Sequence, residues 1–290
     1  MPTAIKQRPQ GPVKPVARTG GGVLSRISPI GATKVGRLKL SLYGLPKTGK
    51  TRLACTFPKP LLIIGSEDGT ASVVGTKGVE FVQLQATDEV HELTDALRQG
   101  RWKSVVIDNA TKMREMRITE LFAAKGMDVP ERKPFLYADK VWKDVWVQCS
   151  QDLRKILGAI LDLPREVELN VVIIAQEQTF TGDDDGASSN SDLIKPAIGS
   201  ALGKSLCMFI NAECDYICQT FIRAAVEERP SPVKGAGNQK VKTGKHEFCL
   251  RVGPHETYIT GFRMPLGMPD PPDVLVDPSY DKIIKLIRGQ

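Results

Sequence analysis

The sequence has 290 residues, of which 41% are hydrophobic and 25% are charged, and its formal net charge is +7. These values are ordinary for a globular protein with a buried core. No apolar run is long enough to cross a bilayer, and the N-terminus lacks the apolar segment of a secretory signal. We therefore expect a soluble protein of the cytoplasm that does not bind membranes.

The positive charge is concentrated at the N-terminus, because no acidic residue precedes Glu67. Six of the 40 basic residues lie in 1–36, and the rest of the chain has 34 basic against 33 acidic residues. The segment is rich in Pro and Gly, so we expect a disordered N-terminal arm. Two interpretations stay open, a solubilising tail or an arm that follows a phosphate backbone. The six basic residues are Lys6, Arg8, Lys14, Arg18, Arg26 and Lys34.

Short apolar strands alternate with helical segments over the first two thirds of the chain. The runs at 61–64 and 171–175 have no polar residue between their apolar ones, which suits a parallel sheet covered on both faces. The pattern predicts an α/β fold with a mainly parallel sheet flanked by helices. The expected strands are 38–43, 61–64, 79–84, 105–107 and 171–175. The expected helices are 51–55, 88–99, 111–125 and 139–163, the last as one long helix or a pair of helices.

The last third of the chain predicts further strands, which we expect to be antiparallel and to extend the sheet. A helix is expected at 201–209, strands at 215–222, 246–252 and 258–262, and a short helix at 282–288. Two flexible segments are expected, an acidic one at 182–191 and a basic one at 230–245 with Lys234, Lys240, Lys242 and Lys245. We thus expect an arm (1–36), one domain (37–265) and a Pro/Asp-rich spacer with a short helix (266–290).

Residues 44–51, Gly-Leu-Pro-Lys-Thr-Gly-Lys-Thr, match the phosphate-loop pattern G-x-x-x-x-G-K-[ST] between an expected strand and an expected helix. In such a loop the glycines let successive N–H groups approach phosphates. Lys50 brings a charge to the β- and γ-oxygens, and Thr51 supplies a magnesium ligand. The sequence therefore predicts a nucleoside triphosphate site formed by Gly44, Leu45, Pro46, Lys47, Thr48, Gly49, Lys50, Thr51 and Arg52.

Polar residues follow three of the expected buried strands, whose carboxyl ends converge in a parallel sheet. Asp108 is the expected second magnesium residue, and because Asn109 follows it, the catalytic base must come from elsewhere. Glu67 is the best candidate to orient the attacking water, with Asp68 as a rival. Gln176 is expected to sense the γ-phosphate, and neighbouring Glu177 is an alternative.

This order of motifs resembles the RecA-type ATPase core. The segments 43–46, 54–60 and 106–111 are similar to phage-encoded, RecA-like P-loop proteins of the AAA-domain type, and the resemblance spans 37–265. It implies hydrolysis of ATP with Mg²⁺ and action on single-stranded DNA in recombination, annealing or replication. It also implies a homo-oligomer, a ring or a filament, working in the cytoplasm of a bacterial host.

The resemblance further implies catalytic roles for Lys50, Glu67, Gln176 and a basic residue that reaches a neighbour's nucleotide. That residue corresponds to Arg263, although the lysine of the family's Lys-x-Arg pair is Gly261 here. Arg251 is a second candidate for the role.

The part of the chain that would contact DNA stays open. Basic candidates are the arm, the 234–245 segment, Lys112, Arg114 and Arg117, and candidate stacking aromatics are Phe135, Tyr137 and Phe180. The main alternative function is an AAA-type motor or loader subunit that acts on protein partners. A nucleotide kinase, which would need an arginine-rich lid that we do not find, and a non-hydrolysing scaffold are further alternatives.

Overall fold

The computed structural model describes residues 37–67, 73–129, 140–180, 197–230 and 238–290. The expectations for the arm, for the acidic segment and for Asp68, Phe135 and Tyr137 lie outside the described residues.

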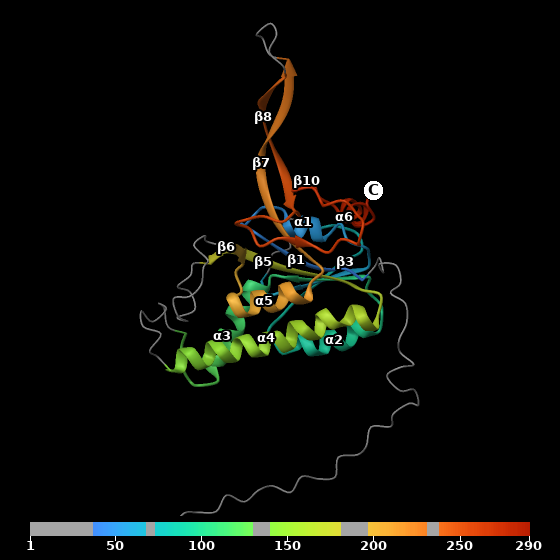
Figure 1. Cartoon of the computed structure of the whole chain (residues 1–290). Helices are drawn as coiled ribbons and strands as arrows, with labels where there is room; N and C mark the ends of the chain where they lie inside the picture. Colours follow the sequence, from blue (N-terminus) through green and yellow to red (C-terminus); the bar gives the residue numbers. More distant parts are fainter. Residues whose placement is uncertain (1–36, 68–72, 130–139, 181–196, 231–237) are drawn as a thin grey trace, which may run out of the picture. The chain divides into compact units, whose positions relative to one another are not determined.

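The described residues form one twisted sheet with helices on its two faces (Figure 1). In chain order the strands are β1 (Lys39–Gly44), β2 (Leu61–Gly65), β3 (Val79–Gln83), β4 (Ser104–Asp108), β5 (Asn170–Phe180), β6 (Ala197–Ser200), β7 (Tyr216–Pro230), β8 (Asn238–Arg251), β9 (Gly261–Phe262) and β10 (Val274–Val276). The helices are α1 (Lys50–Ala54), α2 (Glu89–Arg98), α3 (Ala110–Ala123), α4 (Lys140–Glu166), α5 (Lys204–Glu213) and α6 (Tyr280–Ile287).

The main path of the sheet runs β10-β8-β7-β1-β5-β4-β2-β3, with β6 paired to β5 and β9 paired to β7. The strands from β7 to β3 along this path are parallel, whereas β8, β9 and β10 join by antiparallel pairing. This confirms the predicted fold class, an α/β fold with a mainly parallel sheet flanked by helices and antiparallel strands toward the C-terminus. The central strands are mostly apolar because both of their faces are buried.

Two hydrophobic cores lie on opposite faces of the sheet. Helices α2 to α5 pack on one face, and α1 packs with α6 on the other (Figure 1). Within the strands successive side chains alternate between the two cores, so Leu42 joins the core of α1 and Tyr43 joins the core of α2 to α5. Each fully buried large apolar side chain contributes about 1.5–3 kcal/mol, which fixes the register of these strands.

The register brings the carboxyl ends of four parallel strands to one edge. Gly44 at the end of β1 lies level with Gln176 in β5, and Gly65 at the end of β2 lies level with Asp108 at the end of β4. The phosphate loop leaves β1 at this same edge. The polar residues that follow these strands in the sequence are therefore neighbours in space.

The prediction of a flexible basic segment at 230–245 is wrong for 230 and 238–245, which are strand residues, and 231–237 with Lys234 lie outside the described residues. β7 runs to Pro230 and β8 starts at Asn238, and the two strands pair from Gln219–Arg251 to Pro230–Asn238. We call these two strands the β7–β8 ribbon (Figure 1). The sequence misses the ribbon because its strands are largely exposed beyond the sheet edge, so no buried face imposes an apolar alternation.

Smaller differences concern element ends and short strands. β6 and β10 were not predicted, and α5 begins three residues later than expected. The 266–290 segment contributes β10, which pairs with β8, and α6, whose three isoleucines are buried. The six cysteines are buried free thiols. Among the described helices, none is both long and apolar enough to span a membrane.

Candidate functional site

The phosphate loop depends on its two glycines. Gly49 caps α1 with φ 86°, a left-handed conformation that a side chain disfavours. At Gly44 a Cβ atom would lie 2.4 Å from the main-chain oxygen of Thr220 in β7. Gly44 thus allows β7 to lie close to the loop, and Gly49 allows the backbone conformation that starts α1.

Lys50 folds back over the loop. Its Nζ donates to the carbonyl oxygens of Gly44 at 2.8 Å and Leu45 at 2.7 Å. Burial lowers the pKa of the Lys50 ammonium below its ordinary value, and the carboxylates of Asp108 and Glu177 oppose this effect. An anion at the loop would offer this ammonium stronger, charge-assisted hydrogen bonds than two carbonyls do.

Thr51 and Asp108 form the part of the site that suits a magnesium ion. The Thr51 hydroxyl donates to Oδ2 of Asp108 at 2.6 Å, so the first turn of α1 meets the end of β4. Burial raises the pKa of Asp108, while the Thr51 hydrogen bond and the Lys50 charge lower it in part. A hydroxyl and a carboxylate are hard oxygen donors of the kind that Mg²⁺ prefers, so the residues fit this cation.

Asn109 links the candidate base to the rest of the site. Its Nδ2 donates to Oε1 of Glu67 at 3.0 Å, and its Oδ1 accepts from the main-chain nitrogen of Lys112 at 2.7 Å. The second contact caps the N-terminus of α3. Sequence reasoning treated Asn109 only as a missing acid, although an Asn directly before a helix is a capping signal.

Gln176 and Glu177 belong to β5 and lie at this same edge of the sheet. The main-chain nitrogen of Gln176 donates to the Thr111 hydroxyl at 3.0 Å, which ties β5 to the first turn of α3. The side chain of Glu177 is hydrogen-bonded to β7, since Nε2 of Gln219 donates to Oε2 of Glu177 at 2.8 Å. Gln219 in turn accepts from Nε of Arg251 at 3.1 Å, so one amide connects the carboxylate with the guanidinium.

A cavity of about 610 Å³ lies beside the phosphate loop, and its lining does not include Asn109, Gln176 or Glu177. The lining contains most of the predicted machinery and two aromatic rings that the sequence did not single out, Phe81 and Phe248. The full lining is Lys47, Gly49, Lys50, Thr51, Arg52, Ile63, Glu67, Phe81, Asp108 and Phe248.

A smaller cavity of about 200 Å³ lies next to the first one and shares Gly49, Arg52 and Phe248 with it. The segment 277–279 before α6 completes its wall. The Arg52 guanidinium carbon lies 5.0 Å from the centroid of the Phe248 ring. Planar groups therefore stand between the two cavities, where a flat base could pack.

Arg263 does not lie with the other predicted catalytic residues. It donates to Asp215 at 2.9 Å and to the carbonyl oxygen of Ala212 at 3.2 Å. Asp215 is bonded to the main chain of Lys39, at the start of β1, so Arg263 lies at the edge opposite the phosphate loop. Arg251 pairs with Gln219, which is level with Tyr43 near the end of β1.

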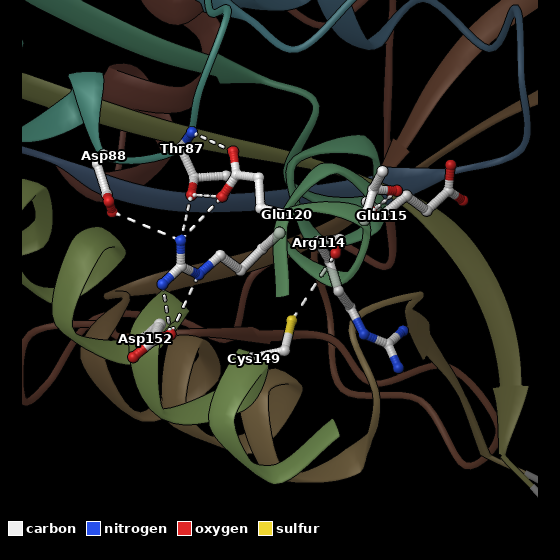
Figure 2. Close-up of polar contacts among 9 residues, drawn as sticks. Thr87, Asp88, Arg114, Glu115, Glu120, Cys149 and Asp152 are labelled. Atoms are coloured by element: carbon white, nitrogen blue, oxygen red, sulfur yellow. Dashed lines mark hydrogen bonds and ion pairs between the residues drawn. The ribbon is translucent and has the colours of Figure 1, made fainter. Parts of the chain in front are cut away.

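The three basic candidates for DNA contact on α3 differ in what they touch. Arg117 binds Asp152 at 2.8 Å and Glu120 at 2.9 Å, and Asp88 lies 3.7 Å away (Figure 2). Lys112 pairs with Glu115 at 2.8 Å. Both charges are therefore compensated within the protein.

Arg114 is the exception on α3. Its guanidinium carbon lies 4.1 Å from the ring centroid of Trp146. Figure 2 shows the Arg114 side chain pointing away from Asp88, Glu120 and Asp152. Burial lowers the pKa of Arg114.

The sequence matches a known protein family. A model described as an AAA domain matches residues 37–264. No curated protein matches the chain. Among solved structures, the chain is similar to the RadB recombinase crystal structure, with 13% identity over 73% of this chain and 86% of that chain and a TM-score of 0.35. The family match covers well over half of the sequence and includes the phosphate loop, Glu67, Asp108 and Gln176, so the chain belongs to the AAA domain family of P-loop proteins.

Proposed function

We propose that the chain binds ATP with Mg²⁺ and hydrolyses it. The observation that carries this proposal is the cavity in which Lys50 and Thr51 of α1 meet Asp108 at the end of β4 and Glu67 just after β2. A phosphate loop alone would serve any nucleotide-binding protein. A carboxylate on the same cavity that is separate from the cation residues is what hydrolysis requires in addition.

Each residue of the site has its own role in the proposed reaction. Main-chain amides of the loop and Lys50 hold the β- and γ-phosphates. Thr51 and Asp108 would hold Mg²⁺, which when bound neutralises charge that develops on the phosphate oxygens. Glu67 orients the attacking water, and the amide of Asn109 keeps the carboxylate from turning away. Gln176, level with Gly44, is the proposed sensor.

The nucleotide base is proposed to pack near Phe248 and Arg52, at the boundary of the two cavities. The ring and the guanidinium are the planar groups that the α1 end of the loop presents. Replacing Phe248 with Leu should weaken ATP more than inorganic triphosphate, because only ATP has a base to lose contact.

Single-stranded DNA is the proposed partner, and a groove between α4 and α5 supports it. The groove holds about 450 Å³ and is lined by Arg154, Lys204, Ser205, Met208 and Phe209. Two cations next to an aromatic ring and a flexible thioether suit a backbone phosphate with a stacked base. The guanidinium of Arg154 lies 5.7 Å from the ring centroid of Phe209.

A homo-oligomer, ring or filament, remains part of the proposal. For the residue that acts on a neighbour's nucleotide, the geometry favours Arg251 over Arg263. Arg251 stands at the level of the phosphate-loop edge, whereas Arg263 is bonded at the other edge of the sheet. Arg251→Ala should reduce hydrolysis only under conditions in which subunits associate.

The test is hydrolysis by the full chain with Mg²⁺ alone, with single-stranded DNA, with duplex DNA, and with protein extract depleted of nucleic acid. We expect single strands to stimulate hydrolysis more than duplex. Stimulation by the protein fraction alone would favour the motor or loader function instead. Nucleotide binding without turnover in all four conditions would indicate the scaffold function.

A further inference from the structure

The β7–β8 ribbon is rooted beside the phosphate loop. β7 pairs with β1 up to the Gly44–Thr220 position, and β10 pairs with β8 only at 249–251. Beyond Thr220 and Phe248, the described residues provide no strand on the outer edges of the ribbon. Figure 1 shows the ribbon leaving the sheet near α1. Its last anchored residues are therefore those next to the loop.

Thr220 is joined to the loop by a hydrogen bond between two buried hydroxyls. Oγ1 of Thr220 lies 2.7 Å from Oγ1 of Thr48, and the two residues are 1% and 7% exposed. Thr48 Oγ1 also lies 2.7 Å from the carbonyl oxygen of Leu45. A hydroxyl has one hydrogen, so Thr48 donates to Leu45 and Thr220 donates to Thr48, because its other acceptor, the Tyr43 carbonyl oxygen, lies farther away at 3.4 Å. The result is a chain of hydrogen bonds from β7 to the first turn of the loop.

The second strand of the ribbon meets the loop through Phe248. A Cβ at Gly49 would lie 3.0 Å from Cδ1 of the Phe248 ring, so the ring rests against the loop backbone. The main-chain oxygen of Phe248 accepts from Asp277 at 2.8 Å, which fixes β8 at this point. Both strands of the ribbon thus touch the loop, one by a hydrogen bond and one by packing.

We propose that Thr220 is a positioning residue that holds the phosphate loop ready for the nucleotide, and that it couples nucleotide occupancy to the β7–β8 ribbon. The inference rests on the proposed nucleotide binding and adds a residue from outside the loop. A loop that is ordered before the ligand arrives loses less conformational entropy on binding. Thr220 supplies this order from β7, a strand that the phosphate-loop motif does not include.

Coupling is reciprocal by thermodynamic necessity. If nucleotide binding restrains the ribbon through Thr220, then a partner that restrains the ribbon must tighten nucleotide binding by the same factor. On the ribbon, Lys242 and Lys245 are exposed, whereas Arg223 pairs with Glu247 at 3.0 Å.

The test compares Thr220→Val with Thr220→Ser in the full chain. Val keeps the shape and removes the hydroxyl, whereas Ser keeps the hydroxyl. We expect Thr220→Val to raise the Kd and the KM for ATP about two- to tenfold, the usual effect of one neutral hydrogen bond, with kcat at saturation unchanged. Thr220→Ser should behave as the unaltered chain.

A double-mutant cycle with Thr48→Val examines the proposed contact itself. If the two hydroxyls act as a pair, the double variant should lose no more affinity than Thr48→Val alone. Losses that simply multiply would show that Thr220 acts elsewhere. The cycle also gives a result if Thr220→Val lowers stability, because affinity is compared among folded variants.

Amide hydrogen exchange of 222–227 and 241–247 measures the coupling. A non-hydrolysable ATP analogue should slow exchange in the unaltered chain and in Thr220→Ser, and less so in Thr220→Val. Equal slowing in all three, or a lower melting temperature with an unaltered Kd, would overturn the inference. Those results would overturn the inference while nucleotide binding stands. If instead the unaltered chain binds no nucleotide, the proposed function itself fails, so the two failures can be told apart.

Discussion

The Thr51 hydroxyl and the Asp108 carboxylate meet at 2.6 Å, although 57 residues separate them in the chain. This contact joins the helix after the phosphate loop to the end of β4. Burial raises the pKa of Asp108 above its ordinary value of 3.8, and the hydroxyl and Lys50 offset the burial only in part. The carboxylate is therefore held in place at some cost to stability, as at many sites built to bind a cation.

Replacing Asp108 with Asn should stabilise the nucleotide-free protein at neutral pH and weaken its Mg²⁺-dependent ATP binding. Because the folded pKa is raised, the carboxyl favours the folded state most when protonated, and this contribution is lost as pH rises through the folded value. The neutral amide avoids that loss and can still accept from Thr51. Melting temperatures of both proteins between pH 3.5 and 8 check this, and the gain should vanish at the acidic end. A variant less stable at pH 7 would contradict the argument.

Lys50→Ala should abolish measurable ATP binding, because its ammonium is the positive charge that lies over the loop, bonded to the carbonyl oxygens of Gly44 and Leu45. Hydrogen bonds to a charged group are worth about 1.5–3 kcal/mol each, so the loss of two should weaken binding by at least about a hundredfold. Titration with a fluorescent ATP analogue measures it. Lys125→Ala is the control, since Lys125 is an exposed lysine that lines neither of the two cavities at the loop and should matter little. Equal losses in both variants would refute the assignment to Lys50.

Glu67→Gln should keep ATP affinity and slow hydrolysis by about 10²- to 10⁴-fold, the usual contribution of a positioned base. Single-turnover hydrolysis with binding measured separately checks the prediction. Asn109→Asp is a second variant, because Asp can still cap α3 but cannot donate to Glu67. Its turnover should fall while the helix stays intact. Unchanged turnover in Glu67→Gln would transfer the role to Asp68 or Glu177.

Arg154→Ala with Lys204→Ala should weaken single-stranded DNA binding and reduce the log–log salt slope by about 1.4, or about 0.7 per lost phosphate contact. The control removes two exposed lysines away from the α4–α5 groove, Lys125 and Lys143. Filter binding at several salt concentrations gives both slopes. If the control shifts the slope as much, the groove has no special part in binding.

Deletion of 1–36 should also flatten the salt slope, by up to about 4 if all six basic residues contact single-strand phosphates. ATP binding should not change, because the phosphate loop and its partners lie within the remaining chain. Replacement of the six basic residues by Gln in the full chain separates charge from length. A slope that neither variant alters would reduce the segment to a solubilising tail.

The sequence predicted the strands from β1 to β5 and their carboxyl-edge residues because these features are local. Buried parallel strands are apolar runs, and a phosphate loop is a contiguous pattern of eight residues. The convergence of residues 44, 67, 108 and 176 followed from a general property of parallel sheets. Their proposed catalytic roles stay predictions.

The ribbon and the partners of the site residues could not be read in the same way. The β7–β8 ribbon is largely exposed beyond the sheet edge, so its pairing leaves no buried apolar face in the sequence. Phe248 and Thr220 reach the loop from about 170 to 200 residues later in the chain, and no periodicity encodes such a contact. Arg263 is placed by its bond to Asp215, which a motif match does not reveal.

By itself, then, the sequence determined the class of fold, the phosphate loop and the acids around it, since each follows from neighbouring residues along the chain. Only the tertiary structure decided which side chains touch the loop, which arginine stands at its edge and which cations are already compensated. The reason is physical: these relationships depend on strand register and packing between distant segments, and the hydrogen bonds that result join atoms whose separation along the chain carries no signal.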